Sequence, residues 1–314
     1  MLSSRPPIQV IGVPQDLGQQ LRGVAMGPNA IRIAGLLPQL RRLGYAVTDF
    51  GDIDCRTVAT ARSEDLPNLH YAEDVVRDAE LLADAVAGAV AAGQFPLVLG
   101  GDHSIAIGTM AGLARHEPRQ GLIWVDAHAD FNTPETTPSG NIHGMPVAAI
   151  LGDGDPRLAN VGGVNPKAIA GNTVLVALRD VDREEAARIR NSDLSYYTMR
   201  KIDERGLSDV MQDIIATVTA DGVERVHLSF DTDAIDPTLA PGTGTTSMGG
   251  LTYREAHLMM EMLADADIIT SAEFVEVNPT LDDGNATAEL IVELIASLCG
   301  KRIVGTAAPI GLGP

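Results

Sequence analysis

The feature that most constrains this chain is an alternating run of metal-ligand side chains, Asp126-Ala127-His128-Ala129-Asp130. It follows residues 122–125, Leu-Ile-Trp-Val, whose short apolar pattern predicts a buried strand. Side chains two residues apart on a strand point the same way, so Asp126, His128 and Asp130 are predicted to leave one face together. A polar loop with capping aspartates would explain the same letters. This stretch alone leaves both interpretations open.

Apolar segments of strand length alternate with helical patterns along the whole chain. Strands are predicted at 8–13, 45–50, 95–99, 122–125, 173–178, 194–198, 224–230 and 268–275. This alternation is typical of an α/β fold with three αβα layers around a mostly parallel eight-stranded sheet. No linker or shift in composition divides the sequence, so residues 1–314 are predicted to form a single domain.

Turn and cap residues set the expected helix boundaries. A helical pattern opens at Gly27-Pro28-Asn29 and ends at Gly44, and others lie within 69–92 and 204–220. Ser104 is predicted to cap the helix that follows the 95–99 strand. Thr252 and Glu255 stand three residues apart, which predicts a capping box.

Composition excludes several classes of function. The formal net charge is −19 and only three of the 23 basic residues are lysines, which argues against nucleic-acid binding. No apolar stretch approaches the 18 or so residues of a membrane span, and two cysteines are too few for a disulfide framework. A cytoplasmic location is therefore expected. The tail at 305–314 carries no predicted function.

Polar groups with metal-binding capacity follow four predicted strands. Ligands of parallel α/β sheets bind beyond the carboxyl ends of the strands, so these groups are expected to meet at one edge. In chain order the groups are His103, the run at 126–130, the pair Asp231 and Asp233, and Glu276. Helix caps and solvated loop acids are the alternative, but coincidence at four strand ends is improbable.

The donor set indicates which metal would bind. Four aspartates and two histidines make an oxygen-rich site with imidazole and no thiolate, which favours Mn²⁺ over Zn²⁺. Two divalent cations would balance four carboxylates, whereas one would leave like charges packed together. A two-metal site makes hydroxide near neutral pH and so predicts a hydrolase. Phosphate esters are disfavoured because no Lys or Arg cluster accompanies the motifs.

Four motifs then give a family resemblance. The chain carries Gly-Gly-Asp-His-Ser at 100–104, Asp-Ala-His-Ala-Asp at 126–130, Ser-Phe-Asp-Thr-Asp at 229–233 and Glu-Val-Asn-Pro at 276–279. In this order they strongly resemble the ureohydrolases, and among them the arginases, from about residue 12 to about residue 298. The resemblance implies a single α/β domain that hydrolyses L-arginine to L-ornithine and urea with a hydroxide bridging two Mn(II) ions.

The resemblance also implies roles for individual residues. One manganese would be held by His103, Asp126, Asp130 and Asp231, and the other by His128, Asp126, Asp231 and Asp233, with Asp126 and Asp231 bridging. Asp130 would hydrogen-bond the hydroxide and then pass a proton to the departing amine. His143 would shuttle protons, and Glu276 would orient the guanidinium. Ordering a loop is the alternative role of His143, and capping a strand end that of Glu276.

Specificity for an amino acid requires groups that read its carboxylate and amine. By the same resemblance, Asn132, Thr137 and Ser139 would bind the α-carboxylate, Asp182 the α-amine, and Glu185 would assist through water. Individually, the first three residues could be ordinary turn residues. Arginases form trimers or hexamers, so a homo-oligomer is expected.

Three alternative functions remain open from the sequence. The chain could be another ureohydrolase, such as an agmatinase or guanidinobutyrase, although agmatinase-type sequences usually show His-Gly-Thr where this one has His-Gly-Met at 143–145. It could be a non-catalytic binding paralogue, yet no ligand or proton shuttle is missing. A deacetylase-like hydrolase would instead hold one metal per chain.

Overall fold

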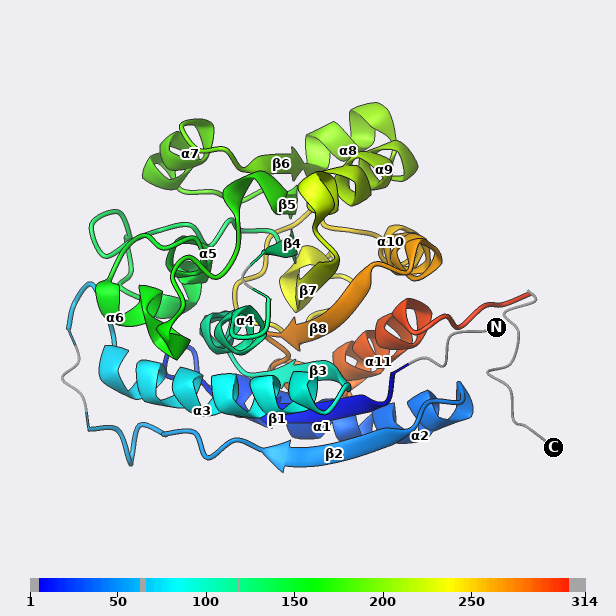
Figure 1. Ribbon diagram of the computed structural model, residues 1–314, viewed down its shortest axis with the longest axis horizontal. Helices are drawn as coiled ribbons and strands as arrows, with labels where there is room; N and C mark the ends of the chain where they lie inside the picture. Colours follow the sequence, from blue (N-terminus) through cyan, green and yellow to red (C-terminus); the bar gives the residue numbers. More distant parts are fainter. Residues whose placement is uncertain (1–5, 63–65, 118, 305–314) are drawn as a thin grey trace.

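The computed structural model describes residues 6–62, 66–117 and 119–304, so the 305–314 tail lies outside the described residues. Its centre is an eight-stranded sheet in the order β2-β1-β3-β8-β7-β4-β5-β6, with every neighbouring pair parallel. Figure 1 shows the strands in this order from β2 at the bottom to β6 at the top. The predicted eight-stranded α/β fold is confirmed. The strands are β1 Ile8–Val13, β2 Val47–Asp52, β3 Phe95–Gly100, β4 Gln120–Val125, β5 Thr173–Leu178, β6 Ser195–Thr198, β7 Arg225–Asp231 and β8 Ile269–Val275.

Helices cover both faces of the sheet because successive strand residues point to opposite faces. Along β3, Leu97 and Leu99 pack into one buried apolar cluster, and Val98 packs into another. The first cluster contains α1 Gly27–Ile33, α2 Leu36–Arg42, α8 Met199–Arg205, α9 Leu207–Val218, α10 Tyr253–Ala266 and α11 Ala286–Leu298. The second contains α3 Ala72–Ala91, α4 Ala106–Ala114, α5 Pro146–Ile150 and α7 Arg183–Arg190.

The helix expected from Gly27 to Gly44 is wrong in its continuity, whereas the helix expected within 204–220 is confirmed as α9. The helix expected from Gly27 to Gly44 is two helices, α1 and α2, separated at Gly35 with φ 93°. A separate helix, α8, precedes α9, and Gly206 with φ 84° separates the two. A left-handed backbone suits glycine and interrupts the helical hydrogen bonds. The apolar pattern of the sequence nevertheless continues across both breaks.

The two predicted caps have different outcomes. Thr252 and Glu255 form the expected capping box at the start of α10. Ser104 is not an N-cap, because the carboxylate of Asp102 accepts its N–H at 3.0 Å and caps a short 3₁₀ turn, His103–Ile105, before α4. That turn buries His103 directly after β3.

Two further observations concern helix length and the cysteines. Among the described residues, no helix combines the length and apolar content that crossing a membrane requires. The remaining described α-helix, α6 Pro156–Ala159, is a single turn. Cys55 and Cys299 are not joined by a disulfide.

The close approach of α3 and α4 gives a stability prediction. A Cβ added at Gly108 of α4 would lie 2.6 Å from the carbonyl oxygen of Ala79 in α3. Gly108→Ala should therefore lower the free energy of unfolding by about 1–3 kcal/mol, because the helix backbones must separate. At Gly88 of α3, an added Cβ meets nothing within 4 Å. Gly88→Ala should raise the free energy of unfolding by about 0.5–1 kcal/mol through helix propensity.

Denaturant unfolding of both variants measures this difference. Equal effects of the two substitutions would contradict the tight helix crossing.

Candidate metal centre

The ends of β3, β4 and β7 bring a first group of predicted ligands together. His103 Nδ1 lies 3.2 Å from Asp126 Oδ2, 3.3 Å from Asp130 Oδ2 and 3.0 Å from Asp231 Oδ2. All four residues are buried. His103 Nδ1 therefore contacts all three carboxylates predicted to share an ion with it, and Asp126 and Asp231 form with it a group of mutually close ligand atoms.

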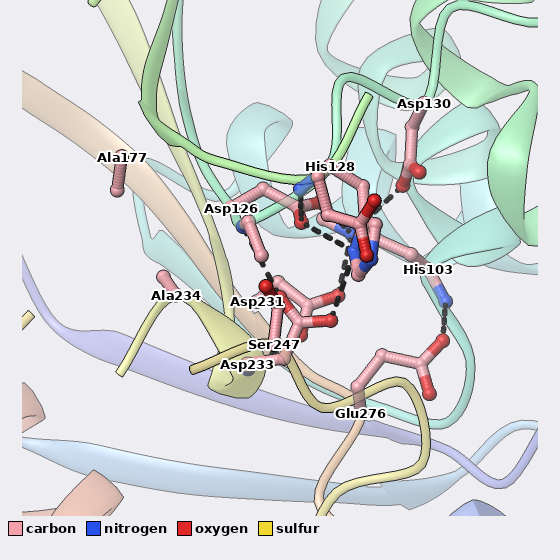
Figure 2. A network of polar contacts seen from close by, with 12 residues as sticks. His103, Asp126, His128, Asp130, Ala177, Asp231, Asp233, Ala234, Ser247 and Glu276 are labelled. Carbon is pink, nitrogen blue, oxygen red and sulfur yellow. Dashed lines mark hydrogen bonds and ion pairs between the residues drawn. The ribbon is translucent and has the colours of Figure 1, made fainter. Parts of the chain in front are cut away.

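A second group adjoins the first and shares one carboxylate with it. His128 Nδ1 lies 3.3 Å from Asp126 Oδ1 and 3.1 Å from Asp233 Oδ2. Asp126 thus faces His103 with one oxygen and His128 with the other, as Figure 2 shows. In each triplet, His103–Asp126–Asp231 and Asp126–His128–Asp233, the ligand atoms lie within 4.8 Å of one another. The cluster can hold two metal ions.

Asp231 belongs to the first group only. Its Oδ2 faces His103, whereas its Oδ1 accepts the backbone N–H of Asp233 at 2.8 Å. Its predicted bridging of both metals stays a prediction.

Strand alternation, the predicted reason why the side chains of 126, 128 and 130 leave one face together, is wrong. Strand β4 ends at Val125, so strand alternation does not extend to Asp130. Asp130 instead reaches His103 from a left-handed backbone with φ 48°. Asp126 is fixed separately, because Trp124 donates its indole N–H to Oδ2 at 3.0 Å.

Crowding of buried carboxylates shifts their pKa values upward. Burial and the neighbouring Asp126 raise the pKa of Asp130 to about 6 and that of Asp233 to about 7. Burial, Asp233 and Asp126 raise the pKa of Asp231 well above its ordinary value. Like charges at this spacing need cations between them, so the donor set fits divalent metals.

The two imidazoles respond in the opposite direction. Burial lowers the pKa of His103 and His128, but their carboxylate contacts outweigh it and raise both values well above normal. Burial likewise opposes the charge of Asp126, yet contacts with both imidazoles hold its pKa below its ordinary value. When divalent ions displace these protons, four carboxylates and two imidazoles are available as ligands for two ions.

Glu276, at the end of β8, lies beside the metal cluster. Its Oε1 accepts the backbone N–H of His103 at 2.9 Å and lies 3.1 Å from Nδ1 of His143. Its Oε2 accepts a hydrogen bond from the side chain of Gln19 at 2.7 Å. Figure 2 shows the carboxylate pointing to the backbone of His103. Burial raises the pKa of Glu276, but His143 outweighs this effect and lowers it.

The residues predicted to read the substrate line one cavity of about 240 Å³. Asn132, Thr137, Ser139, Asp182 and Glu185 all face it, and so do His128, Asp130, His143, Asp231 and Asp233. The cavity therefore joins the predicted metal ligands to the predicted specificity residues.

Several of these residues also have local structural contacts. Asn132 donates its side-chain amide to Asp182 at 3.2 Å, and Asp182 and Glu185 form a capping box at the start of α7. Glu185 Oε1 accepts the N–H of Phe131 at 2.7 Å, and burial raises the pKa of Glu185 to about 8. The Thr137 hydroxyl accepts the N–H of Gly140 at 3.0 Å. The same residues therefore stabilise the local backbone and line the cavity.

Gln19 and Thr245 are two site residues that the sequence interpretation missed. Gln19 is buried against Glu276, and Thr245 lines the cavity. A signal for Gln19 was present, because the loop after β1 begins at the same sheet edge as the other strand ends. Thr245 lies in the irregular segment after Asp233, where no pattern distinguishes one polar residue from another.

Comparison with known proteins decides the family. A model described as the arginase family matches residues 6–300. The chain belongs to the arginase family. An arginase from Bacillus caldovelox is 52% identical over 298 residues, which cover 95% of this chain and 99% of that protein. An arginase from Bacillus subtilis is 51% identical over 297 residues, with the same coverage of both chains.

Solved structures agree with this membership of the arginase family. The Bacillus caldovelox arginase structure superposes with a TM-score of 0.92 over 95% of this chain and 100% of that one. An Entamoeba histolytica arginase in complex with L-ornithine is 30% identical, with a TM-score of 0.86 and the same coverage.

The contact between His143 and Glu276 predicts a pH-dependent stability. Burial lowers the pKa of His143, but Glu276 outweighs it and raises the pKa to about 9. The stabilisation is therefore complete below the unfolded value of about 6.5 and is lost as the pH rises through 9. His143→Asn should remove roughly 1–3 kcal/mol of pH-dependent unfolding free energy between about pH 6 and pH 9.5.

Denaturant unfolding at fixed metal concentration gives the profile. His116→Asn removes an exposed histidine that contacts the Ala87 carbonyl outside the cavity, so it should keep the wild-type pH dependence. A His143→Asn profile that parallels the wild type would contradict this account.

Proposed function

We propose that this chain hydrolyses L-arginine to L-ornithine and urea. The observation that carries the proposal is the pair of ligand triplets that share Asp126, three of whose members, His128, Asp231 and Asp233, line the cavity. The family membership and the named arginases at about half identity support the same reaction. The Entamoeba arginase bound to L-ornithine supports an amino acid as product.

We propose Mn²⁺ as the ion in both positions. The ligands would be His103, Asp126, Asp130 and Asp231 for one ion, and His128, Asp126, Asp231 and Asp233 for the other. A site of carboxylates with one imidazole per ion suits Mn²⁺ better than the nitrogen- and sulfur-rich sites of Zn²⁺. Two such ions, when bound, supply the Lewis acidity that lowers the pKa of water toward neutrality.

Three side chains of this arginase then perform proton transfer and orientation. Asp130, itself one of the proposed ligands, faces the cavity and would pass a proton to the departing amine. His143 also lines the cavity, and would carry protons between the site and bulk water. Glu276 would orient the guanidinium, with its own carboxylate held by Gln19 and His143.

The predicted specificity residues that line the same cavity would bind the amino-acid end of arginine. Asn132, Thr137 and Ser139 offer neutral donors for the α-carboxylate, and Asp182 offers a carboxylate for the α-amine. Glu185 would assist Asp182 through water. A site that pairs both groups would reject a substrate lacking the carboxylate, because the donors placed for it, among them the buried Asn132, would lose their partner.

Other properties of the chain remain predictions. A homo-oligomer, either trimer or hexamer, and a cytoplasmic location are expected for an arginase of this kind. We also propose a single domain over 1–314, which the family match to residues 6–300 supports.

Parallel urea assays test the proposed substrate. For urea release by the Mn²⁺-loaded protein, kcat/KM should be at least about 100-fold higher with L-arginine than with agmatine or 4-guanidinobutyrate. Each of these two compounds lacks one of the two recognised groups. Comparable turnover of agmatine would replace the arginase assignment with an agmatinase. Absence of urea from all three compounds would favour a non-catalytic paralogue.

Matched variants separate metal binding from proton transfer. Asp231→Ala should abolish loading of two ions, because it removes a carboxylate from the His103 triplet. His143→Asn should keep both ions and lose about 100-fold or more in kcat, as expected for a general acid–base group. Elemental analysis of both variants, with urea assays, measures the difference. An emptied site in His143→Asn would show that this histidine acts structurally.

A further inference from the structure

Arg179, directly after β5, has a guanidinium whose hydrogen bonds within the described residues all go to backbone carbonyls. Its Nη2 lies 2.5 Å from the oxygen of Asp233 and 2.8 Å from that of Ser247. Nη1 lies 3.3 Å from the oxygen of Ala234 and 3.4 Å from that of Ala177. A planar fork of five N–H donors can hold several carbonyls at fixed angles, which an ammonium cannot do.

The backbone around Arg179 supports the other side of the metal centre. The N–H groups of Arg179 and Asp180 donate to the oxygen of Ala127 at 2.9 and 3.0 Å. Ala127 lies between the ligands Asp126 and His128, and its own N–H donates to Oδ1 of Asp233 at 3.2 Å. Residue 179 therefore joins the two strand ends that supply the whole Asp126–His128–Asp233 triplet.

A bulge in β5 places this arginine. Ala177 is buried with φ 74°, and the pairing of β5 with β6 shifts register between Val176 and Leu178. An alanine in this left-handed conformation is strained, and bulges beside active sites commonly redirect a side chain. The carbonyl of Ala177 accepts from Arg179 itself. Figure 2 shows Ala234 and Ser247 near Asp233 at the lower left of the ligand cluster.

Arg179 also closes the loop between β7 and α10. The loop is pinned at its base by a bridge between Ile235 and Leu251, and it carries Thr245 into the cavity wall. Asp236 accepts the N–H groups of Gly249 and Gly250, while Arg179 holds Ser247. A Cβ on Gly250 would lie 2.7 Å from Nη2 of Arg179, so the guanidinium fills the space against this glycine.

We propose that Arg179 is a positioning residue of the metal centre. Its guanidinium fixes the Asp233 backbone and its N–H fixes Ala127, so that His128 and Asp233 stand at ligand spacing in the second triplet. Among the described residues, its guanidinium makes no hydrogen bond to His103, Asp126 or Asp231. The inference rests on the proposed two-metal site, and it predicts that loss of the fork weakens one ion selectively.

The test compares Arg179→Lys and Arg179→Met with the wild type. Each protein is loaded with Mn²⁺, challenged with a chelator and analysed for metal per chain. The wild type should retain two ions, while both variants should retain one and bind the other about 10–100-fold more weakly, the usual effect of losing a ligand-orienting partner. Lysine should be the milder change, because it keeps the charge without the fork. Hydrogen exchange at 232–236 and 245–251 should accelerate in both variants.

Arg115→Lys is the matched control, because Arg115 also donates to a carbonyl, that of Gly162, outside the metal centre. It should leave metal retention unchanged. Retention of both ions by the Arg179 variants would overturn the proposal, and so would loss of both ions together, which would indicate general unfolding. A wild type that never holds two ions would instead refute the proposed two-metal site. These results are distinguishable without any measurement of substrate preference.

Discussion

The repulsion between four buried carboxylates is the constraint on which this structure depends. Asp126, Asp130, Asp231 and Asp233 lie around two imidazoles in a volume that excludes most water, and burial raises the pKa of the last two as well as that of Asp130. Cations between the oxygens would relieve this repulsion and keep the carboxylates charged. The need to hold ions therefore explains both the residue types and the ligand spacing.

Parallel strands solve the problem of bringing these acids together. Strands β3, β8, β7, β4 and β5 are consecutive in the sheet, so their carboxyl ends form one continuous edge. The apolar clusters on both faces make that edge rigid. Local strain then adjusts individual groups, because Asp130, Ala177 and Glu276 all follow or end strands at this edge with left-handed backbones. Residues held in such conformations need surrounding packing to maintain them.

Much of the fold followed from patterns that are local in the chain. The six inner strands were predictable because buried parallel strands are short, apolar and bounded by polar turns, whereas the edge strands β2 and β6 are only partly buried. The capping box at Thr252 was predictable because both partners lie within one helical turn. The helix breaks at Gly35 and Gly206 were not, because a glycine inside an apolar pattern can continue a helix or end it. Ser104 was mistaken for a cap because Asp102 offers a competing acceptor two residues earlier.

The sequence by itself determined the chemistry of the site, since the identities and spacing of His103, the 126–130 run and the Asp231–Asp233 pair fix the available donors. It also indicated the edge where they meet, because strand direction is common to a parallel sheet. Only the tertiary structure decided how the donors divide, with Asp126 facing both imidazoles and Gln19 holding Glu276. Only the tertiary structure showed that Arg179 donates hydrogen bonds to the backbone carbonyls of Asp233 and Ser247. Those contacts join residues far apart in the chain, and no local periodicity records them.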